Sequence, residues 1–278
     1  MALLNVAPAS ETFAANRAVG EVAFDVRASG DVTRRGAVRE AGSLRVRFPS
    51  PEQAGLSAML LNTAGGIAGG DRFDIEASVG ANAALTVTTA AAEKVYRSHG
   101  PDALVNIRLK AEQGARLSWL PQETILFDRA RVMRSIEIEL AEEAALVLAE
   151  IVVFGRLAMG ERVSSGRFID RWRLRRGGKL VFAENVGLDG DVCAALHRSA
   201  SANGGIAIGT ALVVPGDEAV VARVREASEK FGSEVGASAW NGFAMIRFCA
   251  HDPVWLRAHM VAVLTHAVSL TPPRLWLS

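Results

Sequence analysis

The chain has 278 residues, half of them apolar, and carries 31 Lys and Arg against 30 Asp and Glu for a net charge of +1. This composition excludes an intrinsically disordered chain, and the length suffices to bury a substantial core. The balanced charge offers no electrostatic basis for binding nucleic acid or an anionic membrane surface. The two cysteines, Cys193 and Cys249, lie far apart in the sequence and are expected to be reduced thiols.

Targeting and membrane-spanning segments are not expected in this sequence. Residues 1–17 lack a basic stretch, and their apolar run is too short for a signal peptide. The most apolar segment, residues 144–154, is interrupted by Glu150 and is shorter than the ~20 residues that cross a bilayer. These features predict a soluble, cytoplasmic protein.

Alternation of apolar and polar residues with a period of two dominates the first two thirds of the chain and is typical of strands with one buried face. The clearest segments are 21–27, 43–48, 72–77, 104–110 and 134–140. In the last segment we expect Arg134 to be exposed beside the buried Ile136. Further strands are expected at 56–61, 83–89, 115–120, 145–154, 166–175 and 179–186. Turn signals recur roughly every ten residues, a spacing typical of stacked sheets or of a β-solenoid.

Two helices are predicted in the last third of the chain. Residues 217–232 place Val220 and Val224 at helical spacing and end on Gly232. Residues 251–268 begin with Asp252 as N-cap, followed by a proline in the first turn. Because no Pro- or Gly-rich linker divides the sequence, we expect one β-rich domain over 1–278, with its helices in the part that spans 190–278.

The segment "NTAGGIAGGDRFDIE", residues 62–76, contains two pairs of glycines followed by Asp71. A dinucleotide or Walker loop would lead into a helix, whereas these glycines precede an alternating, strand-like segment and no Lys-Ser or Lys-Thr pair. Glycines between two strands supply positive φ angles or permit close backbone approach. A flat patch against which a partner packs is the remaining interpretation.

Two polar clusters could carry chemistry. Residues 91–98 group Lys94, Tyr96 and Arg97, which fits either acid–base chemistry or, more commonly, a strand end with solvated charges. Residues 119–130 contain Glu123 and Asp128, whose spacing would direct them to opposite faces of a strand. This makes them poor partners for one another in glycosidase chemistry and favours local ion pairs.

Glu150 stands inside a hydrophobic strand, where a carboxylate must be paired, neutral or exposed to a wet cavity. An ion pair with Arg156 and a place in an internal channel are both consistent with the sequence. The five histidines form no recognised metal motif, and no nucleophile elbow is present. The residues therefore do not indicate a dedicated metalloenzyme.

Five segments in order resemble the landmarks of the UreD-type (also called UreH) urease accessory proteins, from about residue 40 to the C-terminus. The segments are "NTAGGIAGGDRFDIE", "TTAAAEKVYRS", "LSWLPQETILFDRA", "EIVVFGRLAMGE" and "PPRLWLS". The resemblance implies a two-layered, helically wound β-sheet scaffold, mainly β and β-solenoid-like, with two helices in the C-terminal third. It also implies a protein that is not an enzyme and binds no cofactor tightly.

In function, the resemblance implies a scaffold that binds apo-urease and the F-type accessory protein, which recruits the G-type GTPase, and that assists nickel insertion into urease. The residues assigned to its structural and partner-facing motif are Gly65, Gly66, Gly69, Gly70, Asp71, Lys94, Tyr96, Arg97, Glu123, Asp128, Arg156 and Glu161. Nickel in transit would need sparse oxygen ligands along a wet path, for which the candidates are Asp71, Glu150 and Glu161. The alternative from another class is a β-solenoid glycan-active enzyme that pairs Glu123 or Asp128 with a distant carboxylate.

Overall fold

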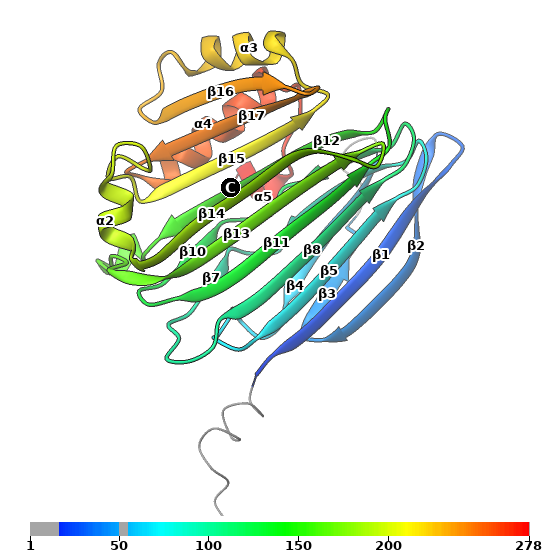
Figure 1. Cartoon of the computed structure of the whole chain (residues 1–278). Coiled ribbons are helices and arrows are strands. Elements are labelled where there is room, and N and C mark those ends of the chain that lie inside the picture. The colour runs from blue at the N-terminus through cyan, green and yellow to red at the C-terminus, as the bar shows by residue number, and fades with distance from the viewer. Residues whose placement is uncertain (1–16, 50–54, 278) are drawn as a thin grey trace, which may run out of the picture.

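Two β-sheets face one another in the computed structural model, with helices packed on the outside of one of them (Figure 1). The structure describes residues 17–49 and 55–277. Residues 1–16, on which the expected absence of a signal peptide depends, lie outside the described residues. None of the helices in the described ranges is long and apolar enough to cross a membrane.

The first sheet has seven strands and the second has ten. In spatial order, the first sheet consists of β14 (Lys179–Asp191), β13 (Ser165–Arg176), β11 (Arg131–Leu140), β8 (Ala103–Ala111), β5 (Arg72–Val79), β1 (Val19–Ser29) and β2 (Val32–Gly42). The second consists of β16 (Glu234–Trp240), β17 (Phe243–Ala250), β15 (Ala207–Val214), β12 (Ala145–Phe154), β9 (Arg116–Trp119), β6 (Ala84–Thr89), β4 (Leu56–Asn62) and β3 (Leu44–Arg47). The short β10 (Thr124–Leu126) pairs with β12, and β7 (Glu93–Val95) pairs with β10.

Between β4 and β13 the chain crosses repeatedly from one sheet to the other. Each turn runs in the same direction, so β5, β8, β11 and β13 pair in parallel in the first sheet and β4, β6, β9 and β12 in the second. The predicted two-layered, helically wound β-sheet is therefore confirmed. The strands β2, β7, β10, β15, β16 and β17 were not predicted. Strand β2 has no buried position in its pattern, β7 and β10 are three residues long, and β15 and β17 are buried on both faces.

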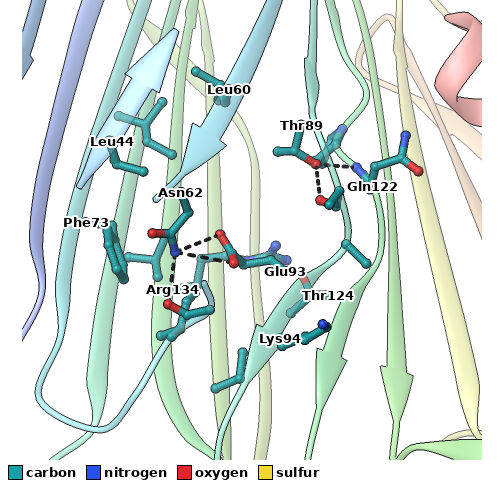
Figure 2. A pocket seen from close by; sticks show the side chains of 18 of the residues that line it. Leu44, Leu60, Asn62, Phe73, Thr89, Glu93, Lys94, Gln122, Thr124 and Arg134 are labelled. Atoms are coloured by element: carbon teal, nitrogen blue, oxygen red, sulfur yellow. Dashed lines mark hydrogen bonds between the residues drawn. The ribbon is translucent and has the colours of Figure 1, made fainter. Parts of the chain in front are cut away.

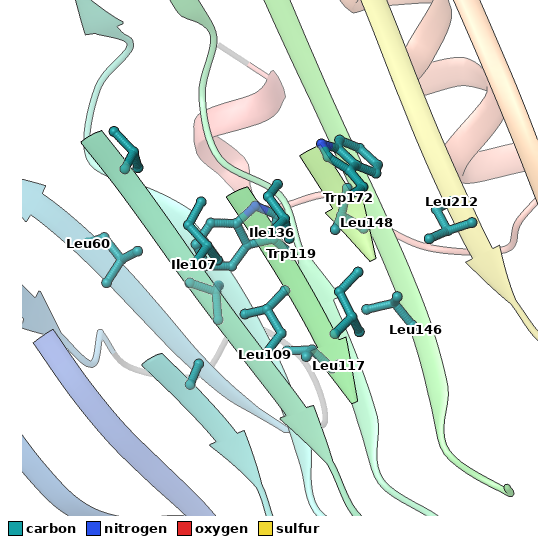
Figure 3. Close-up of a cluster of buried hydrophobic side chains, with 14 of the residues drawn as sticks. Leu60, Ile107, Leu109, Leu117, Trp119, Ile136, Leu146, Leu148, Trp172 and Leu212 are labelled. Carbon is teal, nitrogen blue, oxygen red and sulfur yellow. The ribbon is translucent and has the colours of Figure 1, made fainter. Parts of the chain in front are cut away.

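The main core lies between the two sheets, where leucines, isoleucines and two tryptophans interdigitate (Figure 3). Their positions follow the period of two along each strand. On β11, Ile136, Ile138 and Leu140 point inward, and Arg134 shares their phase. The expectation that Arg134 is exposed was therefore wrong, since only 9 % of this residue is accessible to solvent.

A second core lies between the outer face of the second sheet and the helices α3 (Glu218–Ser228), α4 (Pro253–His266) and α5 (Arg274–Leu277). Both predicted helices are confirmed, although α3 ends at Ser228, before Gly232. The Asp252 side chain caps α4 by accepting a hydrogen bond from the Val254 amide. Three short elements, α2 (Val192–His197), α5 and the 3₁₀ turn η1 (Leu157–Met159), were not predicted.

Strand β12 is buried on both faces, which explains its continuous apolar run. Leu146 and Leu148 pack into the core between the sheets, whereas Ala149 and Ile151 pack toward the helices. Glu150 has the phase of Leu148 and therefore faces the space between the sheets.

Candidate functional site

The segments that stand out in the sequence come together along one corner of the winding. Ile67, Val95, Leu126 and Phe154 occupy equivalent positions in neighbouring turns, joined by parallel pairing. The glycine run, residues 93–98, residues 124–129 and residues 152–156 thus form adjacent layers of a single structure. The distance in sequence between these segments is the length of chain in one turn of the wound sheets.

The glycine run connects β4 to β5 with the backbone geometry that the sequence predicted. Gly65, Gly66 and Gly70 have positive φ angles of 78°, 142° and 89°. A Cβ atom on Gly66 would lie 2.8 Å from the carbonyl oxygen of Lys94, and one on Gly69 would clash with the side chain of Ser98. The glycines are therefore required for conformation and for close packing of adjacent turns.

Asp71 closes this loop from within. Its carboxylate accepts hydrogen bonds from the backbone amides of Ala18 at 2.8 Å and Ala68 at 2.7 Å. The side chain is buried, with 4 % of the residue exposed, and its two oxygens join the loop to the backbone just before β1.

On the outside of the corner, aromatic and charged side chains stack from turn to turn. The Tyr96 hydroxyl donates to the carbonyl of Gly65 at 2.7 Å, and its ring meets Phe127 edge-on at 5.1 Å between centroids. The guanidinium of Arg156 lies 4.3 Å from the centre of the Phe127 ring and donates two hydrogen bonds to Glu161, which lower the pKa of that carboxyl. Arg156 is therefore paired with Glu161, and the suggested ion pair with Glu150 is not formed.

Asp128 and Glu123 hold different parts of the chain together. Asp128 Oδ1 accepts hydrogen bonds from the amide and the hydroxyl of Ser164, at 2.8 and 2.7 Å. Glu123 forms an ion pair with Arg257 of α4, the helix that packs on the outer face of the second sheet. Arg257 also donates to the carbonyl of Trp276, which links the terminal segment to this loop. The two carboxylates thus have separate structural partners and do not share a site.

A cavity of about 330 Å³ opens on the inner side of the same corner (Figure 2). Its lining runs from the exposed Gly65 and Lys94 to the buried Arg134 and Glu150, so it extends from the surface into the space between the sheets. Most of the wall is apolar, built from residues of both sheets such as Phe73.

Glu93 lines this cavity beside the exposed Lys94. Asn62, at the end of β4, donates to both of its carboxylate oxygens at 3.3 and 3.2 Å and to the Gly66 carbonyl at 3.0 Å (Figure 2). No Lys or Arg of residues 17–49 and 55–277 forms an ion pair with Glu93. Burial raises its pKa to about 7, and the hydrogen bond from Asn62 offsets only part of that effect. Glu93 therefore changes charge near neutral pH.

The inner end of the cavity is closed by a cluster of three charged side chains. Arg134 donates two hydrogen bonds to Asp170, at 2.9 and 2.6 Å, and its Nη2 lies 2.6 Å from Oε2 of Glu150. Trp119 donates to the other oxygen of Glu150 at 2.9 Å, and Trp172 donates to Asp170 at 2.9 Å. Residues from both sheets thus share one buried polar network.

The charged groups of this cluster shift one another's pKa. Burial alone would lower the pKa of Arg134, but Asp170 and Glu150 outweigh it and raise that pKa. Burial raises the pKa of Glu150, and the contact with Arg134 counteracts this only in part. One cation between two carboxylates leaves a net negative charge when both are ionised, so the neighbouring Asp170 adds to the effect of burial on the pKa of Glu150.

The three residues predicted for a nickel path lie in different places. Glu150 lines the cavity, whereas Asp71 lies in the glycine loop and Glu161 borders a second cavity of about 440 Å³ next to α2. Within the described ranges, no three His, Cys, Asp or Glu side chains are arranged to hold a metal ion. Sequence reasoning missed the inward direction of Glu93 and Arg134, although the phase of each with its apolar neighbours, Val95 and Ile136, could have indicated it.

The comparisons with known proteins agree with one another. A family model described as UreD urease accessory protein matches residues 18–277. A protein of Rhodopseudomonas palustris named urease accessory protein UreD is 67 % identical over 269 residues, covering 97 % of this chain and 96 % of the relative. A protein of the same name from Bradyrhizobium diazoefficiens is 66 % identical over 269 residues, covering 97 % of each chain. The similarity includes all the corner segments.

Proposed function

The chain belongs to the UreD family of urease accessory proteins, and from this membership we propose that it assists nickel insertion into urease as a scaffold with an interior passage for the ion. Its relatives are accessory proteins by name, so the chain is an accessory factor and not an enzyme. The alternative of a glycan-active enzyme that uses Glu123 or Asp128 is thereby set aside.

The observation that carries the proposal is the cavity that joins the protein surface to two carboxylates, Glu93 and Glu150. Oxygen ligands suit a divalent ion in transit, and a site with few ligands releases the ion as readily as it accepts it. Glu93 loses its proton near neutral pH and so becomes an anionic ligand when a cation arrives. In this proposal Asp71 supports the loop at the mouth of the cavity, and Glu161 fixes Arg156 on the outside of the corner.

We further propose that the partners are the F-type accessory protein, the G-type GTPase reached through it, and apo-urease, and that the assembly acts in the cytoplasm. The motif residues at the corner support this, because Lys94, Tyr96, Arg97 and Arg156 gather on one exposed surface beside the cavity mouth. In this proposal nickel is cargo that the protein handles transiently. The proposed partners are proteins, and neither nucleic acid nor a membrane is among them.

Replacement of Glu93 by glutamine tests the passage. The change keeps the size of the side chain and its contact with Asn62 but removes the charge. Urease matured with Glu93→Gln is expected to contain less nickel than urease matured with the wild type, measured by metal analysis of the purified urease. Glu137→Gln, on the exposed face of β11, is the matched control and should behave as the wild type. Full nickel loading with Glu93→Gln would remove this residue from the passage.

A pull-down with the F-type accessory protein tests the scaffold role separately. The wild type and Glu93→Gln should both retain this partner, because the substituted side chain lies inside the molecule. Failure of the wild type to bind the F-type protein and apo-urease alike would contradict the proposed function.

A further inference from the structure

The outer surface of the corner combines exposed cations with exposed apolar side chains. We call it the corner ridge, defined by Lys94, Tyr96, Arg97, Arg129, Arg156 and the turn Leu157–Met159. The side chains of Arg97, Arg129 and Arg156 are 50 %, 56 % and 41 % exposed. The residues Tyr96, Leu157 and Met159 are 37 %, 56 % and 72 % exposed. Such a mixture of tyrosine, arginine and methionine is typical of the centres of protein–protein interfaces.

The ridge carries an excess of positive charge, although the whole chain is nearly neutral at +1. It has four cations against two carboxylates, Asp128 and Glu161, which lie beside Arg97, Arg129 and Arg156. Arg97 and Arg129 lie 3.9 and 3.7 Å from Asp128 Oδ2, beyond the usual hydrogen-bond distance, so their donors remain open to another acceptor. Asp128 directs its other oxygen to the backbone and side chain of Ser164.

The backbone holds these side chains outward. Arg129 has a positive φ of 61°, a conformation that a non-glycine residue adopts at some cost and that often marks a functional constraint. The two hydrogen bonds between Arg156 and Glu161 bracket the turn Leu157–Met159 and project its apolar side chains into solvent. Backbone conformation and this ion pair therefore both contribute to the way the ridge is presented.

We propose that the corner ridge binds an acidic segment of a protein partner, with carboxylates against Arg97 and Arg129 and an apolar side chain against Tyr96 and Met159. The inference rests on the proposed function, since it names how a member of the maturation assembly is held. Charge complementarity identifies the chemistry of the partner. Nucleic acid or an anionic membrane would require a longer track of cations than these four residues form.

Binding measurements with two purified probes, the F-type accessory protein and apo-urease from the same organism, test the ridge. The variants are Arg97→Glu, which reverses an exposed charge, and Met159→Glu, on a residue exposed enough for the fold to be unaffected. Arg175→Glu, an exposed position on β13 away from the corner, is the matched control. Each ridge variant should weaken binding to at least one probe by about tenfold or more, and added salt should weaken wild-type binding.

The results distinguish failure of the corner ridge as a binding site from failure of the proposed function. Wild-type affinity of both ridge variants for both probes would overturn the ridge while leaving the proposed function intact. Equal weakening by Arg175→Glu would also overturn it, by showing a general effect of charge. If the variants instead lose only binding to phosphatidylserine vesicles or to a DNA duplex, the occupant is not an acidic protein segment. A wild type that binds neither probe would overturn the proposed function, and the ridge with it.

Discussion

In the buried cluster, Arg134 is the cation that pairs with both Glu150 and Asp170. Loss of Arg134 and loss of Glu150 should therefore lower stability by different amounts. A buried ion pair is not strongly stabilising relative to apolar packing, but removal of one partner leaves the other charge uncompensated. Loss of Arg134 would leave Glu150 and Asp170 buried without this cation. Loss of the charge on Glu150 leaves Arg134 still bound to Asp170 by two hydrogen bonds.

The first prediction compares Arg134→Met with Glu150→Gln. Arg134→Met should lower the free energy of unfolding by about 3–5 kcal/mol because two buried carboxylates lose their cation. Glu150→Gln should cost only about 1–2 kcal/mol, since Arg134 keeps its charge partner Asp170 and both hydrogen bonds to it. Denaturant unfolding of both variants at one pH measures the difference. Equal losses in the free energy of unfolding would contradict the larger role of Arg134.

The second prediction concerns the pH dependence of stability at Glu93. The pKa of this carboxyl is about 7 in the folded protein and 4.5 when unperturbed, so the folded state binds more protons between these values. The contribution of Glu93 to stability is therefore fully present below about pH 4.5 and declines until about pH 7. Relative to Glu93→Gln, the wild type should lose on the order of 2 kcal/mol across this range, a figure reduced for the water that reaches the cavity.

Unfolding curves of the wild type and Glu93→Gln at a series of pH values measure this difference directly. Other titrating groups are common to both proteins and cancel in the comparison. A constant difference between pH 4 and pH 8 would show that Glu93 keeps about its ordinary pKa and is well solvated.

Among the elements, the connection between β4 and β5 shows how glycines meet two distinct requirements. Gly65 has a positive φ but open space around its Cα, whereas Gly66 has a positive φ and lies against the Tyr96 ring. A side chain at Gly65 encounters only backbone strain. A side chain at Gly66 encounters strain and a collision with the next turn of the winding.

The third prediction follows from this contrast. Gly65→Ala should cost about 1 kcal/mol from backbone strain alone, and Gly66→Ala about 3 kcal/mol or more because adjacent turns must also separate. Gly236→Ala, in β16, has free space and no positive φ, so it should be nearly neutral. Thermal or denaturant unfolding of the three variants gives the order, and an equal cost at Gly65 and Gly66 would exclude the steric contribution.

The elements also show where sequence reasoning succeeds and where it stops. Strands such as β8 and β11 were predicted because one face is buried and the other solvated, which produces clear alternation. The strand β15 is covered on both faces, so alternation is lost. The positive φ angles of the glycines were predicted from residue type, but the cavity was not, because it depends on how far apart two sheets are held. Arg257 was missed as the partner of Glu123, since 134 residues separate them.

The whole molecule has two cores that share the second sheet. On β15, Leu212 faces the core between the sheets and Ala211 faces the helices. On β17, Met245 and Ile246 divide in the same way. A simple solenoid couples only neighbouring turns. Here, in contrast, loosening the helices also exposes the outer face of strands that form the wall of the main core.

The fourth prediction is that the two cores unfold together. Leu256 of α4 is fully buried in the outer core, so Leu256→Ala should lower the free energy of unfolding by about 2–5 kcal/mol. Amide hydrogen exchange should show this loss equally at Ile246 in β17 and at Ile107 in β8, although β8 lies in the other sheet, away from the core that contains Leu256. Leu277→Ala, on a residue that is 59 % exposed, serves as the control and should change neither. Exchange that accelerates in β17 alone would mean that the helical layer opens independently, leaving the wound sheets and their cavity intact.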